Sequence, residues 1–230
     1  MHNIEPGDIS RAAENFLRLE DGQTPTQHGR ERSWDFCYNH FQASPLPTKD
    51  MELSCLQLGY YLASWGMMRG SSYLFRSTNA RHYREAIETI ERYNPRMQDI
   101  DAHRYAEPDV QNLLVDAYAD LREALLPARV SHLTLVTKVM MGVWGVLPSF
   151  DRYFLRGFRS LGESKKEQTA FSGINHRSID LLGHFYSEHA MEIDTVSARL
   201  TTLDFTTGDF TGRCLSRAKV IDMFGFQKGF

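Results

Sequence analysis

The chain has 230 residues and a formal net charge of −3, with 24% charged and 42% apolar residues. These values exclude an intrinsically disordered chain, argue against a protein that coats nucleic acid, and allow a sizeable core. The longest apolar stretch, residues 56–68, is too short and too polar to cross a bilayer, and the acidic residues 1–8 contain no secretory signal. Cys37, Cys55 and Cys214 lack metal-ligand spacing and fit reduced thiols, so we expect a cytoplasmic protein without a membrane segment.

Helical periodicity, together with capping residues, predicts an almost wholly helical chain. We expect Asn94-Pro95 to break a helix, and we find no alternating pattern typical of strands. The expected class is therefore all-α, as a compact multi-helix domain over residues 1–230 or as two packed lobes, about 1–105 and 106–230. The predicted helices cover residues 8–21, 33–41, 50–67, 80–93, 108–125, 131–142, 151–158, 175–186, 191–203 and 218–224.

The stretch from Leu126 to Phe154 carries the clearest pattern. Pro127 closes one helix, Ser131 is a suitable N-cap for a buried apolar helix, and two glycines end that helix. The following residues, 147–150, contain a proline and predict an extended turn, after which Asp151 begins the next helix. A carboxylate is thereby expected at a helix N-terminus beside the cation Lys138. An N-cap role alone would also explain Asp151.

This arrangement resembles the core of the helix-hairpin-helix DNA glycosylases. In that family a Leu-Pro pair opens the hairpin, and a proline turn later delivers a catalytic aspartate. Leu126-Pro127 matches the opening, Leu147-Pro148 matches the later turn, and Asp151 matches the catalytic carboxylate. The resemblance implies a helix-hairpin-helix-like core, duplex DNA with a flipped base as partner, and release of a base as the reaction.

Two departures from the family pattern are informative. Residues 128–130, Ala-Arg-Val, replace the hairpin glycines, and His132 stands near the position of the family's nucleophilic lysine, 19 residues before Asp151. Lys138 is therefore the remaining candidate for a catalytic amine. The altered hairpin suggests a specialised branch that removes modified bases from phage DNA in bacterial defence.

Base excision needs aromatic walls for the extruded base and polar groups that read its edge. The candidate walls are aromatic residues that could equally belong to the core. The predicted substrate-binding residues are Trp34, Asp35, Tyr38, Asn39, His40, Trp65, Arg69 and His132.

Basic residues are concentrated after the central stretch. Between Lys138 and Lys166 there are six basic and two acidic residues, and a second basic segment starts at Arg213. We expect a phosphate-binding face here, although a solvated helix face has the same composition. The predicted nucleic-acid contacts are Arg152, Arg156, Arg159, Lys165 and Lys166.

Two other functions remain open. Arg177 and His184 have the spacing of the Arg-to-His motif of HEPN-type ribonuclease toxins, a short motif whose spacing Arg96 and His103 share. A non-catalytic interaction protein, with the aromatic helix at Trp34 as its interface, is the third hypothesis. Asp180 and His184 alone do not make a metal site, and no cofactor motif is present, so we expect neither metal nor cofactor.

Overall fold

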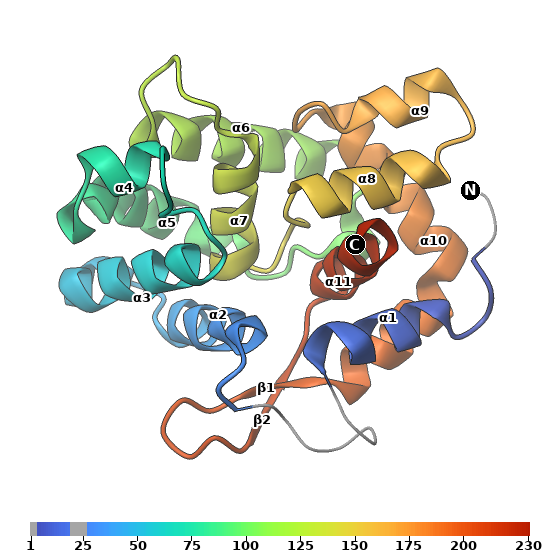
Figure 1. Cartoon of the computed structure of the whole chain (residues 1–230), viewed down its shortest axis with the longest axis horizontal. Helices are drawn as coiled ribbons and strands as arrows, with labels where there is room; N and C mark the ends of the chain where they lie inside the picture. Colours follow the sequence, from blue (N-terminus) through green and yellow to red (C-terminus); the bar gives the residue numbers. More distant parts are fainter. Residues whose placement is uncertain (1–3, 19–26) are drawn as a thin grey trace.

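The computed structural model describes residues 4–18 and 27–230 and shows a mostly helical, compact domain (Figure 1). Within these residues there are 11 α-helices and one two-stranded hairpin, and none of the helices is long and apolar enough to cross a membrane. The α-helices are α1 (Asp8–Leu17), α2 (Ser33–Ala43), α3 (Met51–Ser64), α4 (Tyr73–Ser77), α5 (Arg84–Met97), α6 (Pro108–Leu125), α7 (Leu133–Val143), α8 (Arg152–Leu161), α9 (Lys165–Ala170), α10 (His176–Arg199) and α11 (Arg217–Gly229). Short 3-10 turns are η1 (Arg30–Arg32), η2 (Pro47–Asp50), η3 (Ala80–Tyr83) and η4 (Ala102–Arg104).

Several predicted helix boundaries are confirmed by their caps. The carboxylate of Asp50 accepts the amide of Leu53 at the start of α3, and Asn175 forms a reciprocal capping box with Ser178 at the start of α10. Pro108 occupies the first turn of α6, where its missing N–H costs nothing.

Other boundaries differ from the prediction. Gly7, with φ of 90°, takes the cap position of α1 in place of Asp8, and the expected end at residues 21–22 lies outside the described residues. Pro95 does not break α5, because it falls in the last turn of a helix that continues to Met97. The connection between α6 and α7 contains a turn closed by the amide of Val130 and the carbonyl of Pro127, and α7 starts at Leu133.

The all-α prediction needs one correction. The chain after α10 forms β1 (Thr201–Leu203) and β2 (Phe210–Cys214), which pair antiparallel with Thr201 opposite Cys214. Helix α2 holds β1 in place: the Asn39 amide donates to the carbonyl of Leu203 at 2.9 Å, and the Leu203 amide donates to Asp35 at 3.0 Å. The hairpin therefore depends on contacts from a distant part of the chain.

Helices α8 and α11 pack backbone against backbone. A Cβ at Gly157 would lie 2.3 Å from the carbonyl oxygen of Gly225, and one at Gly229 would lie 1.8 Å from the carbonyl oxygen of Tyr153. Helix α1 lies against α10 and α11 although it opens the chain (Figure 1). Because α8 also packs against α11, α1 and α8 both contact that helix.

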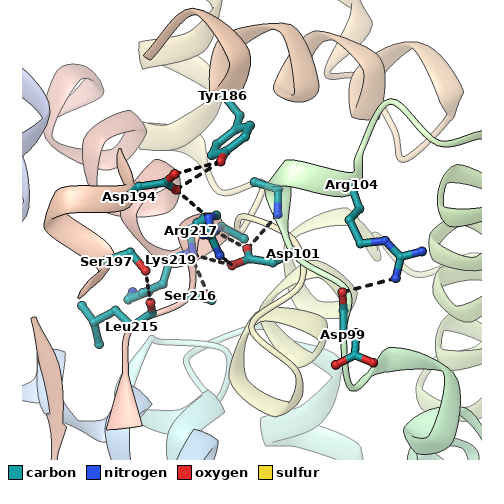
Figure 2. A network of polar contacts seen from close by, with 12 residues as sticks. Asp99, Asp101, Arg104, Tyr186, Asp194, Ser197, Leu215, Ser216, Arg217 and Lys219 are labelled. Atoms are coloured by element: carbon teal, nitrogen blue, oxygen red, sulfur yellow. Dashed lines mark hydrogen bonds and ion pairs between the residues drawn. The ribbon is translucent and has the colours of Figure 1, made fainter. Parts of the chain in front are cut away.

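The N-terminus of α11 is anchored by two carboxylates. Figure 2 shows Asp101 and Asp194 converging on Arg217. Asp101 accepts the backbone amides of Arg217 and Ala218 at 2.8 and 2.9 Å, and Asp194 accepts the Arg217 guanidinium at 2.6 Å. Burial raises the pKa of Asp101, while these amide donors lower it and offset part of that effect. The anchor fixes the axial position of α11, and with it the buried Lys219.

Candidate active site

Asp151 caps α8 and pairs with a buried lysine. Its Oδ1 accepts the amides of Tyr153 and Phe154 at 3.0 Å, and its Oδ2 accepts Lys138 Nζ at 3.3 Å. The side chain of Lys138 is only 5% exposed and that of Asp151 is 15% exposed. The predicted geometry is thus confirmed: a carboxylate lies at a helix N-terminus beside a cation. The helix N-terminus and the Lys138 side chain thus both lie against the carboxylate of Asp151.

The segment that carries Asp151 is held from both sides. On α7, the hydroxyl of Thr134 donates to the carbonyl of Phe150 at 2.9 Å, and the hydroxyl of Thr137 accepts the Phe150 amide at 2.9 Å. From α11, Asp222 accepts the amide of Ser149 at 2.8 Å. Because residues 149 and 150 are bonded from both α7 and α11, the backbone that leads to Asp151 is held in one position.

Two further buried ion pairs surround the same region, and sequence reasoning missed most of their members. Lys219 Nζ lies 2.9 Å from Asp222, and the Arg32 guanidinium lies 3.1 Å from Asp35. Arg32 is fully buried, and its Nε and Nη2 have no hydrogen-bond partner. A signal for one pair was available, since Lys219 and Asp222 lie one turn apart within an apolar helix, and such buried charges are rarely unpaired.

Three cationic side chains lie close to the ring of Trp65. Lys138 Nζ lies 5.0 Å from the centroid of the Trp65 ring, Lys219 Nζ lies 6.0 Å from it, and the Arg30 guanidinium lies 5.2 Å from it. Cations at such distances from an aromatic face are stabilised by the ring quadrupole. The ring is therefore electrostatically linked to the Lys138–Asp151 pair.

A cavity of about 210 Å³ lies at Trp65, and we call it the aromatic cavity. The Phe16 and Trp65 rings are stacked with centroids 5.7 Å apart, and Phe226 meets both rings edge-on. Two buried polar atoms of lining residues, Glu31 Oε1 and Trp65 Nε1, have no hydrogen-bond partner. The cavity is lined by Asn15, Phe16, Arg18, Arg30, Glu31, Trp65, Phe226, Gln227 and Phe230.

The predicted substrate contacts on α2 have structural partners. The buried rings of Trp34 and Tyr38 stack with centroids 4.5 Å apart, and Trp34 Nε1 donates to the carbonyl of Met141. Asp35 and Asn39 bind β1, as described above. Burial raises the pKa of Asp35 to about 6, with Arg32 and the Leu203 amide lowering it in part. These four side chains hold α2 to α7 and to the hairpin.

The remaining predicted contacts are dispersed. His40 Nε2 lies 2.9 Å from the hydroxyl of Ser54, and burial lowers its pKa. Nδ1 of His132 lies 2.6 Å from the hydroxyl of Tyr118, and burial lowers the pKa of His132 too. Arg69 is exposed in the turn after α3. Of the predicted substrate contacts, Trp65 is the one whose ring both contacts Lys138 and lines the aromatic cavity.

The five predicted phosphate contacts are all exposed on α8 and α9. Arg152 and Arg156 both lie against the Tyr153 ring, with their guanidinium carbons 4.5 and 5.9 Å from its centroid. Arg156 donates to the carbonyl of Phe230 at 2.7 Å. These four residues line a cavity of about 510 Å³. The other three basic residues, Arg159, Lys165 and Lys166, are also free to meet solvent ions.

The residues of the ribonuclease hypothesis lie on α10. Arg177 and His184 are exposed two turns apart, and His184 Nε2 lies 3.5 Å from Asp180. The described residues contain no group of three or more His, Cys, Asp or Glu side chains arranged to hold a metal ion. Comparison of the chain with protein-family models, with curated proteins and with solved structures found no match.

Proposed function

We propose that the chain is a DNA N-glycosylase, a hydrolase that releases a base, with modified bases of phage DNA as the substrate class. The observation that carries the proposal is the Lys138–Asp151 pair, fixed at the N-terminus of α8 and linked through Trp65 to the aromatic cavity. A glycosylase needs an oriented carboxylate beside an aromatic pocket that receives the flipped base. In this proposal the Lys138–Asp151 pair supplies the carboxylate and the aromatic cavity supplies the pocket, with Trp65 in contact with Lys138 and in the cavity lining.

The carboxylate of Asp151 stabilises the positive charge that develops on the sugar. When the C1′–N bond breaks, its electron pair leaves with the base, and the sugar becomes an oxocarbenium-like cation. The amides of Tyr153 and Phe154 hold Asp151 in place, so no reorganisation is needed at the moment of reaction. Water then adds to C1′, and the proton that it loses balances the one taken up by the departing base, which has kept the electron pair of the broken bond.

The aromatic cavity serves the departing base. Phe16, Trp65 and Phe226 supply ring faces and edges for stacking. Glu31 Oε1 is an unpartnered acceptor and Trp65 Nε1 an unpartnered donor, and a buried unpartnered polar atom is costly unless a ligand satisfies it. A base edge that presents one donor and one acceptor would satisfy both atoms.

Lys138 acts as a positioning residue in this proposal. Lys138 is engaged on two sides: its Nζ lies 3.3 Å from Asp151 and 5.0 Å from the centroid of the Trp65 ring, and its side chain is only 5% exposed, so it is not placed for attack on C1′. We therefore propose a monofunctional enzyme in which water is the nucleophile. This differs from a lyase, in which an amine forms a Schiff base with the sugar.

The test is incubation with unmodified and phage-modified duplex DNA, followed by alkali or heat to cleave at abasic sites. The proposal predicts abasic sites in at least one modified DNA and no covalent complex after borohydride reduction. A complex that borohydride traps, and that Lys138→Ala loses, would make Lys138 the nucleophile in place of water. If the protein instead cleaves RNA, if His184→Ala abolishes that cleavage, and if no DNA gains abasic sites, the ribonuclease hypothesis is supported and the glycosylase proposal is refuted.

A further inference from the structure

The aromatic cavity has a neighbouring cavity on each of two sides. A larger cavity, of about 720 Å³, shares Arg30 with it, and the cavity between Arg152 and Arg156 shares Phe230 with it. The three cavities are therefore neighbours between the hairpin loop and α8. We call the three cavities together the groove.

The far end of the groove is formed by exposed aromatic side chains. Tyr60 on α3 is 71% exposed, and Phe205 on the loop between β1 and β2 is 75% exposed. Phe205 rests edge-on against Phe36, with centroids 5.2 Å apart. Both rings line the same cavity, so their exposed faces are available for stacking with a ligand in it. Polar side chains, including Gln57 and His28, lie between them.

The charge of the groove favours an anionic ligand. Its lining residues include Arg30, Arg152 and Arg156, together with Arg18, which pairs with the carboxylate of Glu31 at 4.0 Å. Because the chain as a whole has a net charge of −3, this excess of arginine is local. Arginines that alternate with stackable rings along a groove are typical of surfaces that bind single-stranded nucleic acid.

We propose that the groove binds an unpaired DNA strand, with bases stacked on Tyr60 and Phe205 and phosphates at Arg30, Arg152 and Arg156. The inference rests on the proposed function for its choice of DNA. Ring faces exposed in a groove match unpaired bases, since the bases of a duplex already stack on one another. The enzyme would then act next to a strand that is open over several nucleotides.

The test measures binding of a fluorescent oligothymidylate by anisotropy at low salt. Tyr60→Ala and Phe205→Ala should each weaken binding roughly 5- to 150-fold, since stacking contributes about 1–3 kcal/mol per base. Both side chains are mostly exposed, so folding should be unaffected. Phe75→Ala is the matched control, because Phe75 is 63% exposed on α4 and lines none of the three cavities.

Equal binding by the two variants and the wild type would overturn the inference, as would tighter binding of an oligouridylate of the same length. Base release from a blunt duplex is measured in parallel with wild-type protein and Asp151→Asn. If the protein releases bases but does not bind oligothymidylate, the proposed function stands and the proposed strand site is refuted. If oligothymidylate binding depends on Tyr60 and Phe205 but no DNA releases a base, the strand site is supported and the glycosylase proposal is refuted.

Discussion

Replacing Asp151 by Asn removes one charge from a buried pair, and its consequences can be worked out from the structure. Asn caps helices nearly as well as Asp, so the bonds to Tyr153 and Phe154 should persist. Lys138, however, is 5% exposed, and its ammonium would lose the carboxylate that compensates its burial. Breaking a buried pair by removing one partner costs about 3–5 kcal/mol; we expect about 3 kcal/mol, since Asn still offers Lys138 an oxygen.

Activity should fall much further than stability. Loss of an oriented charge in a desolvated site should slow base release by on the order of 100-fold or more. The double variant Asp151→Asn with Lys138→Met separates the two effects, because it leaves no unpaired charge: urea unfolding should recover most of the lost free energy, while base release stays low. Wild-type base release by a folded Asp151→Asn protein would refute the proposed chemistry. No recovery of stability in the double variant would refute the account of Lys138.

Four further outcomes are expected. Burial raises the pKa of Asp35 from 3.8 to about 6, so its contribution to stability is present below pH 3.8 and is lost as the pH rises to 6. The unfolding free energy of the wild type, relative to Asp35→Asn, should fall by about 3 kcal/mol across that interval. Gly157→Ala should lower the free energy of unfolding in urea by about 1–3 kcal/mol, because the added Cβ would strike the α11 backbone. Gly173→Ala is the control, since its Cβ would meet no atom within 4 Å and stability should hardly change. Arg159→Ala should flatten the salt dependence of duplex binding by about 0.9 in logarithmic slope, and an unchanged slope would exclude a phosphate contact. His184→Ala should release bases at the wild-type rate.

The central stretch was predictable because its signals are local. A proline turn, a good N-cap residue and the spacing from Lys138 to Asp151 together place the carboxylate correctly, as the 3.3 Å contact shows. Its catalytic role stays a prediction. Capping by Asn175 and the start of α6 at Pro108 were predictable for the same reason.

The missed features depend on distant contacts. Strand β1 has three residues, too few for an alternating pattern, and it is stabilised by Asp35 and Asn39 from α2. Trp34 and Tyr38 are buried, and their role as substrate contacts stays a prediction, because an aromatic helix fits a pocket or a core equally well in sequence. The aromatic cavity itself joins side chains from α1, α11 and the region after α3, an assembly that no local spacing encodes.

The contact between α8 and α11 has a mechanical consequence. With Gly157, Gly225 and Gly229 leaving no room between the two backbones, we expect the two helices to behave as one rigid body that carries both Asp151 and Phe226. Trp65 lies outside this body and is followed by Gly66 at φ of 73°. The proposed function therefore predicts that Trp65, and not the carboxylate, changes position when a base binds.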